Sequence, residues 1–131
     1  MKQKFCLDLE DARRVAAAAE AEAQKNNWPV VISIVDDGGH LLYLQRDKAQ
    51  LASIEVSIAK AVSALGFRRP TVSWQKLVNE GAPAYLGLPG ALPIEGGGPL
   101  EYEGEIIGAI GISGVMSNQD GVVARAGAAA L

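Results

Sequence analysis

Residues 30–46 read VVISIVDDGGHLLYLQR, two apolar runs separated by a short polar segment. The β-branched run from Val30 to Val35 has apolar residues on both faces and predicts a central strand. Asp36-Asp37-Gly38-Gly39 predicts a tight turn, because such turns need positive φ angles that glycine adopts freely. His40 to Arg46 then predicts the returning strand, so an antiparallel hairpin is expected here.

Helical periodicity lies on both sides of this hairpin. Asp8 predicts the start of a helix that reaches about Lys25 and carries alanines on one face. Thr71 predicts the start of a short helix ending at Asn79, and the proline- and glycine-rich residues 81–93 predict a loop. Residues 51–67 also have helical spacing, with one apolar stripe formed by Ile54, Ile58, Ala61 and Leu65.

A second hairpin is expected after the glycines at 96–98. Leu100–Tyr102 and Glu105–Ser113 predict its strands, with the turn at Glu103-Gly104. Alternation predicts a smooth face on the last strand that could admit a helix, a ligand or another subunit. One face is expected to carry Ile106, Ile110 and Ile112, and the smooth one Ala109, Gly111 and Ser113.

The order of the elements indicates the fold class. Ser117 and Asp120 have capping-box spacing and predict a last helix over residues 118–130. The chain then runs helix, two strands, two helices, about three strands, helix. Hairpin connections imply an antiparallel sheet with helices packed on it, an α+β layered domain. We expect one domain over residues 1–131.

Composition excludes several classes of function. With one His and one Cys, the 131 residues cannot supply a Cys/His zinc site or an internal disulfide. A net charge of −3 gives no basic surface for nucleic acid or an anionic membrane. The longest uncharged stretches, 81–94 and 106–119, are shorter than the ~20 apolar residues that span a bilayer. A soluble cytoplasmic protein is expected.

His40 and Arg46 are the first candidates for chemistry. His40 could ligate iron or transfer a proton, with Asp36 or Asp37 accepting its second ring proton; alternatively it is a half-exposed residue at the hairpin edge. Arg46 shares its strand face but lies about 20 Å away. The two could flank a large flat ligand or meet across a subunit interface.

Other candidates carry weaker signals. Ser57 and Lys60 match S-x-x-K, where a solvated or ligand-facing lysine is favoured over a nucleophile and its base. Gly97 and Gly98 could cradle an anion or line a pocket, although a turn entering a strand is the simpler interpretation. Cys6 and Met116 could donate sulfur to a metal but are more typical of packing residues.

Several ordered motifs resemble the GlcG/HbpS-like family, which includes the C-terminal domain of PduO. Ser33–Leu42 is similar to its VDxGGHL hairpin. The match is collinear from about Leu7 to the C-terminus. Its other motifs are Ala52-Ser53-Ile54, Lys60-Ala61, Arg69-Pro70-Thr71, Gly97-Gly98-Pro99-Leu100, residues 107–114 and Gln119-Asp120.

The resemblance implies a profilin-like α/β/α arrangement, with an antiparallel five-stranded sheet and helices on both faces. It also implies a homo-oligomer, a dimer or larger. Some members bind haem or are described as haem-degrading, and others accompany glycolate or propanediol utilisation. Some haem-binding members carry a histidine on the first helix, whereas residues 9–25 contain none. If haem binds, His40 or a sulfur ligand would have to hold the iron.

Three functions follow as expectations. The first is a small oligomeric protein that binds a planar or small organic ligand, with haem as the named candidate and His40, Arg46, Lys60, Gly97 and Gly98 as its binding residues. The second is an enzyme or accessory protein for a small carboxylated or hydroxylated metabolite, held by Arg46 or Lys60 in a concave pocket. The third is a scaffold without a ligand.

Overall fold

The computed structural model describes residues 1–131. Four α-helices, four β-strands and one short 3-10 helix follow one another along the chain. Their order is α1 (Leu9–Lys25), β1 (Val31–Asp36), β2 (Leu41–Arg46), α2 (Ser53–Phe67), α3 (Val72–Asn79), the 3-10 helix η1 (Pro83–Gly87), β3 (Gly97–Tyr102), β4 (Glu105–Ser113) and α4 (Ser117–Ala128).

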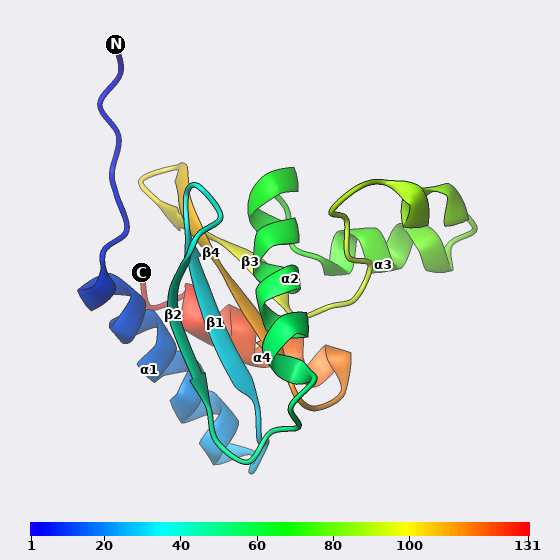
Figure 1. Ribbon diagram of the computed structural model, residues 1–131, viewed down its shortest axis with the longest axis horizontal. Helices are drawn as coiled ribbons and strands as arrows, with labels where there is room; N and C mark the ends of the chain where they lie inside the picture. The colour runs from blue at the N-terminus through cyan, green and yellow to red at the C-terminus, as the bar shows by residue number, and fades with distance from the viewer.

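The strands form one antiparallel sheet in the order β2-β1-β4-β3. Helix α2 covers one face, α1 and α4 lie side by side on the other, and α3 with η1 extends beyond the side of the sheet (Figure 1). The predicted α+β class and the helices on both faces are therefore confirmed. None of the helices is both long enough and apolar enough to cross a membrane.

The expected fifth strand is absent. Between α3 and β3 the chain carries prolines at 83, 89 and 93, which lack the N–H that a strand ladder needs. This segment folds instead as η1 followed by turns. The sheet consequently has four strands, and the prediction of five is wrong.

A β-bulge changes the faces of β4. Leu100 pairs with Gly108 while Glu101 pairs with Ile106, which leaves Ile107 as an extra residue. Such an insertion shifts the alternation of side chains by one position. Ile107 therefore lies in the main core, and Ile106 lines a cavity on the α2 side. The prediction that Ile106 shares a face with Ile110 is wrong.

The main core lies between the sheet and the pair α1 and α4. Helix α1 contributes one valine and four alanines, so the helix backbone approaches the sheet closely. Asp8 begins this helix as predicted: its Oδ1 accepts the Asp11 N–H at 2.9 Å, and Asp11 Oδ2 accepts the Asp8 N–H at 3.2 Å. The principal β contributions are Ile32, Ile34, Leu100, Ile107, Ile110 and Ile112.

Helix α2 turns a different face to the sheet from the one that its apolar stripe predicts. Of that stripe only Ala61 is buried, whereas Ile54, Ile58 and Leu65 are half-buried. The sheet beneath presents small residues, because β1 and β4 place serines and a glycine there. Val35 and Ala109 form a small apolar cluster with α2 beside them. The buried face of α2 matches this sheet surface with Ser53, Ser57, Lys60, Ala61, Ser63 and Ala64.

Two serine pairs hold α2 on the sheet. The Ser33 and Ser57 hydroxyls are 2.6 Å apart, and Ser113 Oγ donates to Ser53 Oγ at 3.2 Å. A side chain at Gly111 would meet the Ser57 carbonyl, so the helix rests directly on the β4 backbone. The smooth face predicted on β4 thus receives a helix.

Candidate functional site

The predicted site residues fall in three separate places. Lys60 and Gly97 are in contact beneath α2, with Gly98 next to them on β3. His40 and Arg46 lie at opposite ends of β2, as the strand spacing predicts. No arrangement within one chain brings all five residues together.

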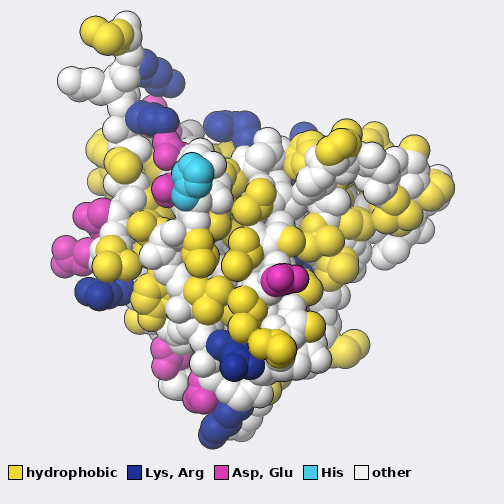
Figure 2. Space-filling model, in the orientation of Figure 1, with side chains coloured by type: hydrophobic (Ala, Val, Ile, Leu, Met, Phe, Trp, Pro, Cys, Tyr) yellow, Lys and Arg dark blue, Asp and Glu magenta, His cyan; other side chains and the backbone are white.

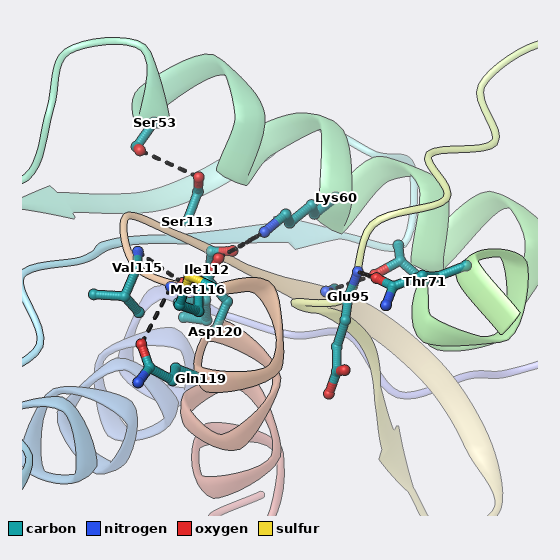
Figure 3. Close-up of polar contacts among 12 residues, drawn as sticks. Ser53, Lys60, Thr71, Glu95, Ile112, Ser113, Val115, Met116, Gln119 and Asp120 are labelled. Carbon is teal, nitrogen blue, oxygen red and sulfur yellow. Dashed lines mark hydrogen bonds and ion pairs between the residues drawn. The ribbon is translucent and has the colours of Figure 1, made fainter. Parts of the chain in front are cut away.

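Lys60 is buried, with 1% of its surface exposed. Its ammonium Nζ donates to Asp120 Oδ2 at 2.9 Å and to the Ile112 carbonyl at 2.8 Å (Figure 3). The expectation of a solvated or ligand-facing lysine is therefore wrong. Ser57 bonds to Ser33 and to the Ile54 carbonyl, so its hydroxyl is not paired with Lys60 as a nucleophile would be with its base.

Asp120 joins this cluster from the first turn of α4. It is 2% exposed, and its Oδ1 accepts the Val115 N–H at 3.3 Å. Burial raises the pKa of Asp120 above its usual range, although the Lys60 ammonium acts in the opposite direction. The predicted capping role is wrong: Gln119 Oε1 accepts the Met116 N–H at 3.2 Å, one position earlier, while Asp120 turns inward.

Gly96 and Gly97, at the start of β3, seal this buried pair. A Cβ at Gly96 would lie 2.7 Å from Lys60 Nζ, and one at Gly97 would meet the Lys60 carbonyl. The Gly97 N–H donates to Thr71 Oγ1 at 2.9 Å, and the Thr71 N–H donates to the Gly97 carbonyl at 3.0 Å. The Gly97 amide is therefore occupied by Thr71, which the sequence had indicated only as a helix start.

Gly97 and Gly98 also line a small cavity. It has a volume of about 240 Å³ and is bordered by Pro99, Ala124 and the ion pair between Arg125 and Glu95, whose Nη1 and Oε2 are 3.0 Å apart. Its walls are mostly apolar or small. The entry of a strand at Gly97 is confirmed, and ligand binding by the two glycines stays a prediction.

His40 lies exposed directly after the β1–β2 turn. Asp36 Oδ1 accepts the backbone N–H groups of Gly38 and His40, each at 3.0 Å, and therefore shapes the turn instead of orienting the ring. The imidazole makes no hydrogen bond within the chain. It folds over Gly38, where a Cβ would be 3.3 Å from His40 Nε2.

The turn beside His40 borders a cavity of about 650 Å³, which we call the His40 cavity. Val62 and Leu65 of α2 and Ile106 of β4 provide apolar walls, and Lys4 and Arg68 provide positive charge. Figure 2 shows the imidazole at the surface with Lys or Arg side chains and hydrophobic side chains near it.

An ion pair ties the N-terminal segment to the rim of the His40 cavity. Lys4 Nζ and Asp37 Oδ2 form this pair. Hydrogen bonding to Asp37 raises the pKa of Lys4, and the same contact lowers the pKa of Asp37. Both groups therefore stay charged across the neutral range.

Arg46 is exposed at the other end of β2, and its Nη1 donates to the Ala49 carbonyl at 3.2 Å. Neither Arg46 nor Lys60 lines one of the three main cavities, so none of these three is the concave acid-binding site of the metabolite alternative. Met116 and Cys6 are exposed, and no three His, Cys, Asp or Glu side chains cluster as metal ligands would.

The fold and these motifs match a known family. Residues 7–129 fit the family model described as "Haem degrading protein HbpS-like". The chain belongs to the HbpS-like family. Among HbpS-like relatives, Protein GlcG of Escherichia coli (strain K12) is 45% identical over 115 residues, which are 86% of this chain and 85% of GlcG.

Solved structures extend the HbpS-like comparison to the fold. The crystal structure of HbpS is 34% identical, with a TM-score of 0.89 over 100% of this chain and 94% of that one. A PduOC:heme complex is 32% identical, with a TM-score of 0.87 over 97% of this chain and 96% of that one. The HbpS-like assignment therefore holds for sequence and for architecture.

Proposed function

We propose that this HbpS-like protein binds haem in the His40 cavity, with His40 as the protein ligand of the iron. The observation that carries the proposal is the single imidazole, exposed and free of hydrogen bonds, which directly follows the Gly38-Gly39 turn that lines this cavity. A haem complex of a relative with the same fold supports it.

The residues of the cavity fit the chemistry of haem. A macrocycle needs apolar contacts, which Val62, Leu65 and Ile106 offer, and its propionates need a cation, which Arg68 offers. The other two cations of the cavity, Lys4 and Lys2, are paired with Asp37 and Glu105. Neutral imidazole is a common iron ligand. When bound, haem would supply a redox-active iron.

Hemin titration followed by absorbance tests this proposal. We expect a saturable Soret band in the wild-type protein and its loss or shift in His40→Ala. Met116→Leu is the matched control, because Met116 is an exposed sulfur ligand candidate outside the cavity, and this variant should keep the wild-type spectrum. An unchanged band in His40→Ala removes His40 as the ligand, and a broad band insensitive to every substitution indicates stacking without a site.

We further propose that the protein forms a homo-oligomer through the outer face of α2. This face carries the apolar residues that the sheet does not bury: Leu51 is 73% and Val62 39% exposed, with Ile54, Ile58 and Leu65 half-buried between them. Figure 2 shows hydrophobic side chains grouped over β2 and α2. Exposed apolar surface of this kind marks an interface, and a second copy is the simplest partner.

A mass measurement in solution tests the interface. Leu51→Asp places a charge at the exposed end of this apolar face, outside the His40 cavity, and should shift the protein toward the monomer. Leu86→Asp is the control, because Leu86 is 59% exposed on η1, away from α2. A monomeric wild-type protein, or equal effects of both substitutions, would contradict this assignment.

A further inference from the structure

A third cavity lies at the other end of β2 from His40, on the α1 side of the sheet. It occupies about 510 Å³ where the end of α1, the α1–β1 turn and the loop after β2 meet, and we call it the Trp28 groove. Its polar wall carries Glu20, Gln24 and Gln45, and Trp28 and Asn27 border it from the turn.

The polar wall is a row of linked side chains. Tyr43 Oη donates to Gln45 Oε1 at 2.9 Å, Gln45 Nε2 donates to Glu20 Oε2 at 2.9 Å, and Gln24 Nε2 donates to Glu20 Oε1 at 3.0 Å. Each amide keeps a second N–H, and Gln24 also keeps its carbonyl. The side chain of Asn27 bonds to nothing in the chain. The groove therefore holds adjacent free donors and acceptors, of which the amides of Gln24 and Gln45 are positioned by Glu20.

The opposite wall is apolar. Trp28 is half-buried against the main core, and Pro29 and Ala23 continue the surface. An aromatic face beside a row of amides and a carboxylate suits a compound with C–H groups on one side and hydroxyl groups at its edge. Hydroxyls both donate and accept, as this row requires.

Charge narrows the class of ligand further. Glu20 and Asp47 carry negative charge into the groove, and Lys48 is its single cation, so an anion meets a net repulsive wall. The His40 cavity has the opposite character. Asn27 and Lys48 adopt φ angles of 58° and 64°, two of the four non-glycine residues with positive φ, so both ends of the groove are held in unusual backbone geometry.

We propose that the Trp28 groove binds a small neutral polyhydroxylated compound, a polyol or a sugar. The compound lies with its apolar face on Trp28 and its hydroxyls against Glu20, Gln24 and Gln45. The proposal is independent of haem binding, because the two cavities share no lining residue.

Titration of ¹⁵N-labelled protein with glycerol and with glucose tests this site. The chain has two indole N–H signals, and a Trp74→Phe variant assigns them. We expect saturable shifts of the Trp28 indole and of the Gln24, Asn27 and Gln45 side-chain amides at millimolar ligand, the affinity range open to such small molecules. Glu20→Gln should weaken binding about tenfold, since it removes a charged acceptor.

Glu22→Gln is the matched control, because Glu22 lies on the same helix but pairs with Lys25, outside the groove. It should retain wild-type affinity. Acetate and tetramethylammonium serve as anionic and cationic probes. Equal losses in both glutamate variants, no saturable shift with either polyol, or tighter binding of acetate or tetramethylammonium than of the polyols would each overturn the proposal.

Discussion

Lys60 places an ammonium group where water does not reach, between α2, β4 and α4. Such a charge is tolerated only when it is paired and hydrogen-bonded, and Asp120 and the Ile112 carbonyl meet both conditions. Because three elements converge on one side chain, the pair also fixes how they sit relative to one another.

Breaking this pair from one side should destabilise the fold strongly. Lys60→Met leaves the Asp120 carboxylate buried without its partner, and we expect a loss of about 3–5 kcal/mol in the free energy of unfolding. The double variant Lys60→Met/Asp120→Asn should be more stable than Lys60→Met alone. Urea unfolding measures all the variants, and strictly additive effects would contradict a coupled pair.

The same pair gives a pH dependence with a defined sign. Burial raises the pKa of Asp120 in the folded chain above the ordinary value of about 3.9. At a pH between the unfolded-state and the folded-state pKa of Asp120, the folded chain binds the proton more tightly than the unfolded chain. The contribution of Asp120 is therefore fully present below the unfolded pKa and declines as the pH rises through the folded pKa.

Asp120→Asn should remove this contribution. Urea unfolding across the acidic range measures the free energy of unfolding of both proteins. As the pH rises, we expect the wild type to lose stability relative to Asp120→Asn. A difference that moves in favour of the wild type over that window would show that pairing with Lys60 outweighs burial.

Sequence reasoning singled out Lys60 but not its partner, for a physical reason. The two residues are 60 positions apart, and helical spacing relates only near neighbours. A buried lysine needs a carboxylate partner, so a lysine known to be buried would have indicated one. The sequence does not show that Lys60 is buried, because a serine-rich helix face resembles a solvent-exposed one. In addition, Asp120 was interpreted as part of a helix cap, so it was not considered as the partner of Lys60.

At the scale of single elements, the start of α1 follows directly from local chemistry. Asp8 and Asp11 exchange bonds with each other's backbone, and this bonding lowers the pKa of Asp11. Both bonds lie within four residues, so the local sequence could predict that the helix starts at Asp8. The prediction succeeded here because no distant partner takes part.

Asp8→Ala should cost about 1 kcal/mol, because the Asp11 N–H loses its acceptor. Glu10→Ala is the control, since Glu10 lies in the same turn but makes no hydrogen bond to the backbone. Urea unfolding compares the two variants. Equal losses would assign the effect to the charge of the first turn instead of the cap.

Helix α2 shows where periodicity fails. Spacing found the helix and its ends within two residues, but the apolar stripe was taken as the buried face. That inference assumes that the sheet surface under α2 is lined by large apolar side chains. Serines and a glycine lie there instead, and they match the small, polar face of the helix. The bulge at Ile107 misled in a similar way, because alternation cannot reveal an inserted residue before the pairing is known.

For the whole molecule, the separation between α2 and the sheet depends on the lack of a side chain at Gly111. Gly111→Ala would drive a Cβ into the Ser57 carbonyl and should destabilise the fold by about 1–3 kcal/mol. Gly66→Ala, on α2 itself, meets nothing within 4 Å and should be neutral or stabilising by up to about 1 kcal/mol. Thermal unfolding measures both, and similar outcomes would contradict close contact between the layers.

The layers were predictable from the order of helices and hairpins, whereas the strand count and the site were not. The fifth strand was expected from the order of elements and from the family resemblance, whereas only β3 and β4 follow α3 in the structure. His40 and Arg46 could be placed at opposite ends of one strand from spacing. The cavities near the two ends of β2 could not be predicted, because they are formed by turns and helices whose positions only the three-dimensional structure shows.

The strand order β2-β1-β4-β3 also has a consequence for the time course of folding. Each outer pair is a local hairpin, but the central seam joins β1 to β4, with Val31 opposite Ser113 across most of the chain. Closing so long a loop is slow, whereas hairpins form within microseconds. The two hairpins should therefore form early and independently of each other. The pairing of β1 with β4, which joins the two hairpins, should then be the rate-limiting step of folding.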